Sequence, residues 1–204
     1  MLRLGLTGGI ACGKTVVGEM LVGLGAHLVQ ADRIAHELME PGQPVYDEVL
    51  RHFGPAILRP GGAIDRAKLA EATFGSGRIT ELNAIVHPAV IARQEEWMDE
   101  VGQREPHAIA IVEAALIFEA GVGSHFDRIV VVTCTPEQRV ERFARRQHLE
   151  LQAARAEVER RMMAQWPAEK KAAAADYVID NSAGLDETRA QVKQVYAELK
   201  AAGH

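Results

Sequence analysis

The stretch MLRLGLTGGIACGKT, residues 1–15, decides the fold of this chain. Its alternating leucines predict a buried strand over residues 2–6, and residues 8–15 then fit the pattern G-x-x-x-x-G-K-[ST]. Glycines let successive backbone N–H groups point into one concavity, which suits phosphate oxygens. Lys14 can reach the outer phosphates of a nucleotide, and the Thr15 hydroxyl can ligate Mg²⁺. The stretch therefore predicts a phosphate-binding loop.

An amphipathic helix is expected directly after this loop. Val17, Met20, Leu21 and Leu24 have the spacing of a buried helical face, and Gly25 supplies a C-terminal stop. A helix that begins near the loop points the positive end of its dipole at the same anion. This context favours a nucleotide site over the alternative, a glycine-rich turn with a surface lysine.

Length and composition suit one compact α/β unit with small insertions. The chain has 204 residues, of which 48% are hydrophobic and 25% charged, and its net charge of −5 argues against general nucleic-acid binding. Two cysteines, Cys12 and Cys134, form neither a disulfide framework nor a metal-ligand spacing, which favours a reducing compartment. With neither a signal-peptide pattern nor an apolar run of membrane-spanning length, a cytoplasmic location and no membrane contact are expected.

Strands and helices alternate along the chain, which predicts a parallel sheet with helical crossovers. Further strands are expected over residues 26–31, 108–114, 129–133 and 177–179. Further helices are expected over residues 33–39, 45–53, 137–148, 153–165 and 186–202. Residues 65–103 read as helical throughout, with Asp65 as a cap and Pro88 in the first turn of a long helix. Residues 40–104 contain no convincing strand and are interpreted as a helical insertion that binds the acceptor.

A phosphate-binding loop serves switches, motors and kinases, so the rest of the chain must choose among them. A GTP switch would carry an N-K-x-D motif, but the only asparagines, Asn83 and Asn181, are not followed by lysine. Motors and remodelling ATPases are usually longer. A small-molecule kinase fits best.

Two acidic residues are expected at the carboxyl ends of strands, where ligands bind in α/β sheets. Asp32 could orient or deprotonate an acceptor hydroxyl, or hold Mg²⁺ through water; the alternative is a helix cap. Glu113 is a candidate for holding Mg²⁺, a role that Glu119 could also take.

Arginines gather between residues 139 and 161, and such a cluster can stabilise the charge that develops during phosphoryl transfer. Arg142 and Arg146 are the favoured members, with Arg161 third, and a solvated face paired with glutamates is the alternative for the others. His87, next to Pro88, is either an acceptor contact or part of a helix start, and spacing favours the structural interpretation.

Over nearly its whole length the sequence resembles the dephospho-coenzyme A kinase family. The resemblance rests on GLTGGIACGKT at 5–15, Ala31-Asp32 with Ile34-Ala35-His36, GAIDRAKLAEATF at 62–74, LNAIVHP at 82–88, LIFE at 116–119, DRIVVV at 127–132, Pro136-Glu137 and DYVIDN at 176–181. It implies that ATP, with Mg²⁺, donates its γ-phosphate to the ribose 3′-hydroxyl of dephospho-coenzyme A. A related small-metabolite or nucleoside monophosphate kinase, or a nucleotide-binding regulator without catalysis, are the alternatives.

The resemblance also implies a three-layer P-loop fold with a five-stranded parallel sheet, a helical acceptor insertion and a helical lid. Residues 1–39, 105–142 and 174–204 would form the nucleotide-binding core, 40–104 the acceptor domain and 143–173 the lid, in a chain for which a monomer is favoured. Catalytic roles fall on Asp32, Lys14 and Arg146. Acceptor contacts fall on Asp32, Arg66 and His87, and metal binding falls on Thr15 and Glu113. Nucleotide binding falls on Gly8, Gly9, Ile10, Ala11, Cys12, Gly13, Lys14, Thr15, Val16, Arg142 and, bordering the adenine, Asn181.

Several positions depart from the family's usual pattern. Ala11 stands where the loop usually has glycine, so it requires a backbone without positive φ there. Cys12 and Thr15 replace serines, and Thr15 is equivalent for Mg²⁺. Gln30 replaces the first aspartate of D-A-D, which leaves the catalytic role to Asp32 alone. The remaining departures are Ala115 for a proline and Gln147 for an aspartate.

Overall fold

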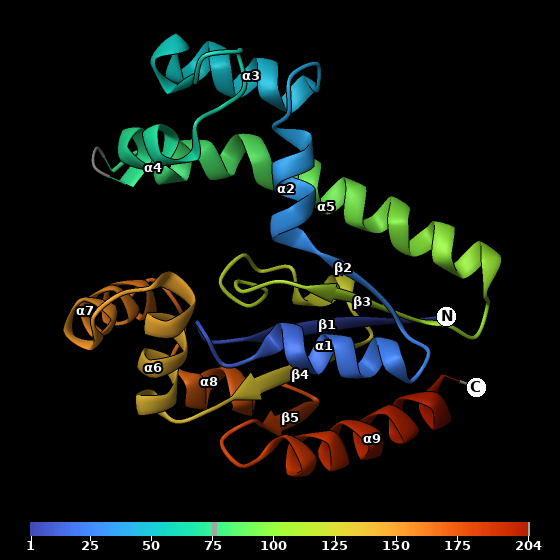
Figure 1. Cartoon of the computed structure of the whole chain (residues 1–204). Coiled ribbons are helices and arrows are strands. Elements are labelled where there is room, and N and C mark those ends of the chain that lie inside the picture. Colours follow the sequence, from blue (N-terminus) through green and yellow to red (C-terminus); the bar gives the residue numbers. More distant parts are fainter. Residues whose placement is uncertain (75–76, 204) are drawn as a thin grey trace. The chain divides into compact units, whose positions relative to one another are not determined.

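The computed structural model describes residues 1–74, with Phe74 as backbone alone, and residues 77–203 (Figure 1). The strands are β1 (Leu2–Gly8), β2 (His27–Gln30), β3 (Ile109–Glu113), β4 (Arg128–Thr133) and β5 (Tyr177–Asp180). The α-helices are α1 (Lys14–Gly23), α2 (Ala31–Leu38), α3 (Pro44–Phe53), α4 (Arg66–Phe74), α5 (Ile79–Arg104), α6 (Pro136–Gln147), α7 (Leu151–Met162), α8 (Ala168–Ala173) and α9 (Leu185–Ala202). Two short 3₁₀ helices, η1 (Pro55–Ile57) and η2 (Gly123–His125), complete the elements.

The strands form one sheet in the order β2-β3-β1-β4-β5. The N-terminal strand β1 lies at its centre and pairs in parallel with β3 and β4, while β4 pairs in parallel with β5. Parallel pairing brings the carboxyl ends of β1, β3 and β4 to one edge. The predicted α/β fold with a five-stranded sheet is thus confirmed, and each predicted strand lies within two residues of the observed one.

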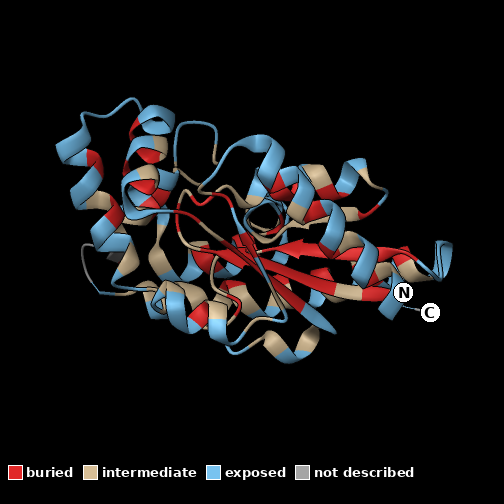
Figure 2. Ribbon diagram, turned by 90° about the horizontal axis from the view of Figure 1, so that it is seen from below, coloured by how far each residue is buried: buried red, intermediate tan, exposed pale blue. Residues whose placement is uncertain are grey.

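The chain divides into two compact units, Met1–Leu28 with Glu100–His204, and Val29–Asp99. In the first unit, α1 and α9 lie side by side and pack on one face of the sheet (Figure 1). That face presents a single buried cluster, and its strand residues are Leu2, Leu4, Leu6, Ile109, Ile111, Val130, Val132 and Ile179. The other face buries Ile117, Ile129 and Val131. Because both faces are covered, the central strands β1, β3 and β4 are almost continuously buried (Figure 2).

The second unit is helical and has its own core, formed by Ile34, Val45, Val49, Ile57, Leu69, Val86 and Val90. Asp65 caps α4 as predicted, since its Oδ1 accepts hydrogen bonds from the backbone N–H of Ala67 at 2.9 Å and of Lys68 at 3.3 Å. Local polar chemistry therefore sets where this helix begins.

One expectation for the helices is wrong, and one observed helix was not expected. Pro88 lies inside α5 rather than in its first turn, because the helix already begins at Ile79. Proline removes a backbone hydrogen bond from a helix interior, and burial of its neighbours Val86 and Val90 in the core of the second unit offsets that loss. Helix α8 was not predicted. It ends within the alanine run at 172–175, and that run was interpreted as a bias of composition rather than as a sign of structure.

A buried ion pair joins α8 to the loop after β3. The Lys171 side chain is 1% exposed; its Nζ lies 2.8 Å from Glu119 Oε1 and donates to the Ala115 carbonyl at 3.0 Å. Glu119 also accepts a hydrogen bond from the backbone N–H of Trp166 at 2.7 Å, and the Trp166 ring stacks on Phe118. The Oε1 atom of Glu119, a sequence candidate for Mg²⁺ binding, is thus occupied by structural partners, whereas its buried Oε2 has no hydrogen-bond partner.

Candidate active site

The loop between β1 and α1 depends on glycine at two positions. Gly8 has φ +152° and Gly13, which precedes α1, has φ +92°. A Cβ on Gly8 would lie 2.3 Å from the carbonyl oxygen of Val132, and a Cβ on Gly13 would lie 2.2 Å from Asn181 Nδ2. Neither position has room for a side chain, so the motif glycines are required by close packing as well as by backbone conformation.

Lys14 holds its ammonium group over this loop. Its Nζ donates to the carbonyl oxygens of Gly8 at 3.2 Å and Gly9 at 3.3 Å. The same residue begins α1, so its charge lies beside the positive end of the helix dipole. The loop therefore concentrates positive potential where an anion can bind.

Thr15 and Glu113 meet although they are far apart in sequence. The Thr15 hydroxyl donates a hydrogen bond of 3.0 Å to Glu113 Oε1, and Glu113 is a buried residue at the end of β3. A hydroxyl and a carboxylate are oxygen donors of the kind that Mg²⁺ prefers, alongside phosphate oxygens and water. The two residues predicted to bind metal are thus brought together, and their donor atoms fit the ion.

The carbonyl oxygen of Cys12 accepts hydrogen bonds from two side chains outside the loop. Asn181 Nδ2 donates to it at 2.8 Å and Arg142 Nη1 at 3.4 Å, while Arg142 Nη2 donates to the Asn181 carbonyl at 2.9 Å. Asn181 is 4% exposed, and its side-chain oxygen accepts from the Thr188 hydroxyl at 3.0 Å. We call Cys12, Arg142, Asn181 and Thr188 the loop clamp. Its contacts fix the shape of the loop, and contact of Asn181 with adenine stays a prediction.

Arg139 is a site residue that the sequence did not single out. The side chain is 4% exposed, its Nη1 would lie 3.0 Å from a Cβ placed on Gly9, and its buried Nε has no hydrogen-bond partner. With Gly9, Cys134 and Met162 it lines a cavity of about 730 Å³. Its helical register is the signal: Phe143, four residues later on the same helix, is buried as well, whereas a run of arginines read alone suggests a solvated face.

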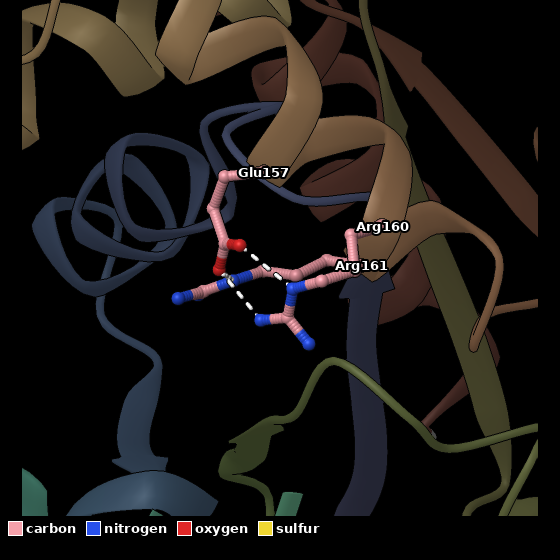
Figure 3. A network of polar contacts seen from close by, with 3 residues as sticks. All are labelled: Glu157, Arg160 and Arg161. Atoms are coloured by element: carbon pink, nitrogen blue, oxygen red, sulfur yellow. Dashed lines mark hydrogen bonds and ion pairs between the residues drawn. The ribbon is translucent and has the colours of Figure 1, made fainter. Parts of the chain in front are cut away.

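Arg146 and Arg161, two of the arginines expected to stabilise transferred phosphate, both lie over one aromatic ring. Their guanidinium carbons are 5.7 Å and 5.3 Å from the centroid of the buried Phe143 ring. Arg161 and its neighbour Arg160 also hydrogen-bond to Glu157 at 2.6 Å and 2.7 Å (Figure 3). In this structure Arg161 is thus neutralised by a carboxylate rather than free for a phosphate.

Replacing Glu157 by glutamine is expected to lower the free energy of unfolding by about 1 kcal/mol or less near pH 7. Hydrogen bonds from Arg160, then from Arg161, lower the pKa of Glu157 to about 2 from its ordinary 4.5. A lowered pKa in the folded state gives stabilisation that is full above the unfolded value and is lost as pH falls through the folded one. The difference between the two proteins should therefore shrink between pH 4.5 and pH 2.

Urea unfolding measured across that pH range tests this expectation. Glu159→Gln, at an exposed position of the same helix, is the matched control and should change stability little at any pH. If the free energy of unfolding of wild type exceeded that of Glu157→Gln by more at pH 2 than at pH 7, the stabilising role assigned to ionised Glu157 would be wrong.

Ala11 contradicts the expectation for its backbone, because its φ is +55°. An alanine in this left-handed region costs about 1–2 kcal/mol. The loop imposes this conformation because Gly9, Cys12 and Gly13 on either side are held by their own contacts. A strained alanine therefore occupies a position suited to glycine.

Ala11→Gly is accordingly expected to raise the free energy of unfolding by roughly 0.5–1 kcal/mol, the strain relieved less the entropy that glycine adds to the unfolded chain. Denaturant unfolding measures this gain, which should appear as a higher midpoint concentration at an unchanged m-value. Ala190→Gly on the exposed face of α9 is the control and should lose about 1 kcal/mol. Equal destabilisation by both substitutions would show that Ala11 carries no strain.

Asp32, Arg66 and His87 all belong to the unit Val29–Asp99. Asp32 is exposed in the first turn of α2, because the helix begins at Ala31, and Arg66 is exposed at the start of α4. Burial lowers the pKa of His36, Arg66 lowers it further, and Asp32 opposes the shift. These three groups therefore lie within electrostatic reach of one another, and sequence reasoning had not assigned a role to His36. Burial lowers the pKa of His87 on α5 as well.

Comparisons with known proteins agree on one family. The family model described as dephospho-CoA kinase matches residues 2–187. A protein of Aquifex aeolicus named dephospho-CoA kinase is 40% identical over 200 residues, covering 98% of each chain. A solved structure from Thermus thermophilus aligns with a TM-score of 0.80 at 32% identity, covering 97% of each chain. The dephospho-CoA kinase of Campylobacter jejuni aligns with a TM-score of 0.71 at 25% identity, covering 99% of this chain and 98% of that one.

In the described part of the chain, none of the helices has the length and apolar character needed to span a membrane.

Proposed function

The chain belongs to the dephospho-CoA kinase family, and we propose that it transfers the γ-phosphate of ATP to the ribose 3′-hydroxyl of dephospho-CoA, giving CoA and ADP. The observation that carries the proposal is the phosphate-binding loop, with Lys14 over its carbonyls and Thr15 bonded to Glu113. These are the parts that a phosphoryl transfer needs on the donor side.

The donor phosphates bind at the loop. Backbone N–H groups at the start of α1 and the Lys14 ammonium hold the phosphate oxygens, while the loop clamp keeps the Cys12 carbonyl turned away from them. Thr15 and Glu113 would hold Mg²⁺, which when bound neutralises charge on the β- and γ-phosphates. Because this positive potential is already in place, little reorganisation is required when charge develops on the transferred group.

Asp32 takes the acceptor proton. In the transfer, the 3′-oxygen forms a bond to the γ-phosphorus, the bond from that phosphorus to the β–γ bridging oxygen breaks, and the hydroxyl proton passes to the Asp32 carboxylate. Asp32 lies in the first turn of α2, two residues after the end of β2, and is exposed, which supports this role. Arg66 and His87, in the same unit, are proposed to contact the acceptor within residues 40–104.

Two arginines of α6 complete the donor site. Arg142 already reaches the loop, and we assign Arg146 to the transferred phosphate, with residues 143–173 acting as the lid that carries it. A guanidinium that rests on an aromatic face keeps its charge only partly solvated, which supports exchange of that contact for a phosphate. The two free cysteines support the reducing environment of the cytoplasm as the proposed location.

An acceptor screen tests the proposed function. Purified enzyme with ATP and Mg²⁺ should release ADP when dephospho-CoA is present, and mass spectrometry should find one added phosphoryl group on the acceptor. AMP and gluconate, the acceptors of related kinases, should give no turnover above background. Faster turnover with AMP would overturn the substrate assignment, and ATP binding without turnover on any acceptor would favour a regulator.

A further inference from the structure

The cavity beside the phosphate-binding loop is not used by the proposed phosphoryl transfer. Its volume of about 730 Å³ lies within the roughly 300–1,000 Å³ that is usual for small-molecule sites. Gly9 forms part of its wall, and the rest comes from the end of β4, the start of α6, the end of α7, the loop that follows, α8 and β5. All of these elements belong to the unit Met1–Leu28 with Glu100–His204, so the cavity lies within one compact unit.

Arg139 brings a buried positive charge to this cavity. The residue lines the cavity, is 4% exposed, and its Nε has no hydrogen-bond partner. Its Nη1 contacts the Met162 sulfur at 3.6 Å, and a thioether is a weak and neutral acceptor. Within residues 1–74 and 77–203, no carboxylate forms an ion pair with this guanidinium. Because burial of an unpaired charge is unfavourable, an anionic ligand would complete the site.

The other charged residues of the wall do not change this conclusion. Glu159 and Glu169 are exposed, so water and salt screen their charges. Lys171 is buried, but it is already paired with Glu119 at 2.8 Å. Arg139 is therefore the residue of the wall that favours an anion.

The rest of the wall suits a slender and mostly apolar chain. Met162, Trp166 and Val178 supply apolar contacts, and methionine side chains adapt to flexible ligands. Gln165 and Thr133 add an amide and a hydroxyl, which can hydrogen-bond to amide groups of a ligand. A molecule with an anionic end, an apolar chain and a few amides fits these groups best.

Gly9 indicates where the anionic end of such a ligand lies. It belongs both to the phosphate-binding loop and to the cavity wall, and Arg139 Nη1 would lie 3.0 Å from a Cβ placed on it. An anionic group on Arg139 is therefore beside the loop that holds the donor phosphates. An acceptor of phosphoryl transfer has to reach the same place.

We propose that the cavity binds the pantetheine 4′-phosphate arm of dephospho-CoA, with Arg139 holding the phosphate and the apolar wall holding the chain. This arm has a phosphate at one end, and a dimethyl-substituted carbon and amide groups along its length. The identity of the acceptor rests on the proposed function, whereas the fit of the cavity to a phosphate on an apolar chain does not. Arg139 is then a specificity residue for acceptors that carry this arm.

Calorimetric titration of the full chain without ATP tests the role of the charge, with pantetheine 4′-phosphate and pantetheine as the two probes. Arg139→Met should weaken binding of the phosphorylated probe by about tenfold or more, the loss expected for a charged hydrogen bond, and that of pantetheine by less than about twofold. Arg139→Lys keeps the charge and should recover part of the loss. Arg145→Met removes an exposed arginine of the same helix and should change neither affinity.

Ala172→Phe tests the cavity while Arg139 stays in place. The added ring fills space at a half-buried position of the wall, so both probes should bind at least about tenfold more weakly. Ala174→Phe, at an exposed position directly after α8, is the matched control and should bind both probes normally. Urea unfolding checks that each variant folds, and Arg139→Met should be no less stable than wild type because it removes an unpaired buried charge.

Kinetics with dephospho-CoA complete the test. Arg139→Met should raise the KM for dephospho-CoA by about tenfold, while kcat and the KM for ATP are nearly kept. Equal binding of the phosphorylated probe by wild type and Arg139→Met, or no effect of Ala172→Phe, would overturn the proposal. A loss of ATP affinity in Arg139→Met without loss of probe binding would assign Arg139 to the donor and overturn it too.

Failure of this proposal is distinguishable from failure of the proposed function. If the phosphorylated probe binds through Arg139 but dephospho-CoA is not phosphorylated, the proposed function fails and the anion site stands. If dephospho-CoA is phosphorylated and neither Arg139→Met nor Ala172→Phe changes its KM, the proposed function stands and the cavity does not bind the arm.

Discussion

Lys14→Ala is expected to lower kcat/KM for ATP by about three orders of magnitude, the largest loss among the donor-site residues. The ammonium group is a localised positive charge at the loop, where it lies 3.2 Å from the Gly8 carbonyl oxygen. In the bound state it would exchange these carbonyls for phosphate oxygens, whose charge increases toward the transition state. Both ATP binding and kcat should therefore fall.

A coupled assay for ADP, with calorimetric titration of ATP, measures the two losses separately. Lys193→Ala, at an exposed position of α9, is the control for removal of a lysine and should leave both parameters unchanged. The variant should also unfold at nearly the wild-type denaturant concentration, because Lys14 is only half-buried. A kcat within threefold or so of wild type would remove Lys14 from the chemistry.

Asp32→Asn should lower kcat by about 10²–10⁴-fold while ATP affinity is nearly kept. The substitution preserves size and hydrogen bonding but removes the base that accepts the 3′-hydroxyl proton. Because the Asp32 side chain is exposed, the substitution should lower the free energy of unfolding only slightly. The rate should be compared under saturating dephospho-CoA, so that any effect on acceptor binding is separated from chemistry.

The alternative role of Asp32 is electrostatic, as an acidic residue in the first turn of α2. Asp47→Asn makes the same change in the first turn of α3, at an exposed position of the same unit. If Asp32 acts only on the helix dipole, both variants should lose similar stability and neither should lose kcat. If it is the base, only Asp32→Asn should lose rate.

Features that depend on residues close together in sequence were the most predictable, both at the donor site and elsewhere in the fold. The loop, the start of α1 and the Asp65 cap follow from local chemistry, because glycine, lysine and aspartate act on backbone groups a few residues away. The meeting of Thr15 with Glu113 was also predictable, although 98 residues separate them, because parallel strands bring their carboxyl ends to one edge.

Contacts that depend on packing could not be read from the sequence. Arg139 and Arg142 lie on one short helix, yet only the tertiary fold decides that the first is buried beside Gly9 and the second reaches Asn181. The positive φ of Ala11 escaped prediction because glycine is the residue that signals such a backbone. The assignment of acceptor residues relies on family resemblance and stays a prediction.

The loop clamp has a consequence for biosynthesis. Cys12 is synthesised 169 residues before Asn181, yet the Asn181 side chain holds the Cys12 carbonyl and in turn depends on Thr188. During translation the motif is therefore complete in sequence long before it can hold the shape that binds nucleotide. Nascent chains stalled before β5 should not be retained on immobilised ATP, whereas chains released after α9 should be. The ability to bind ATP would thus report that synthesis and folding have proceeded through α9.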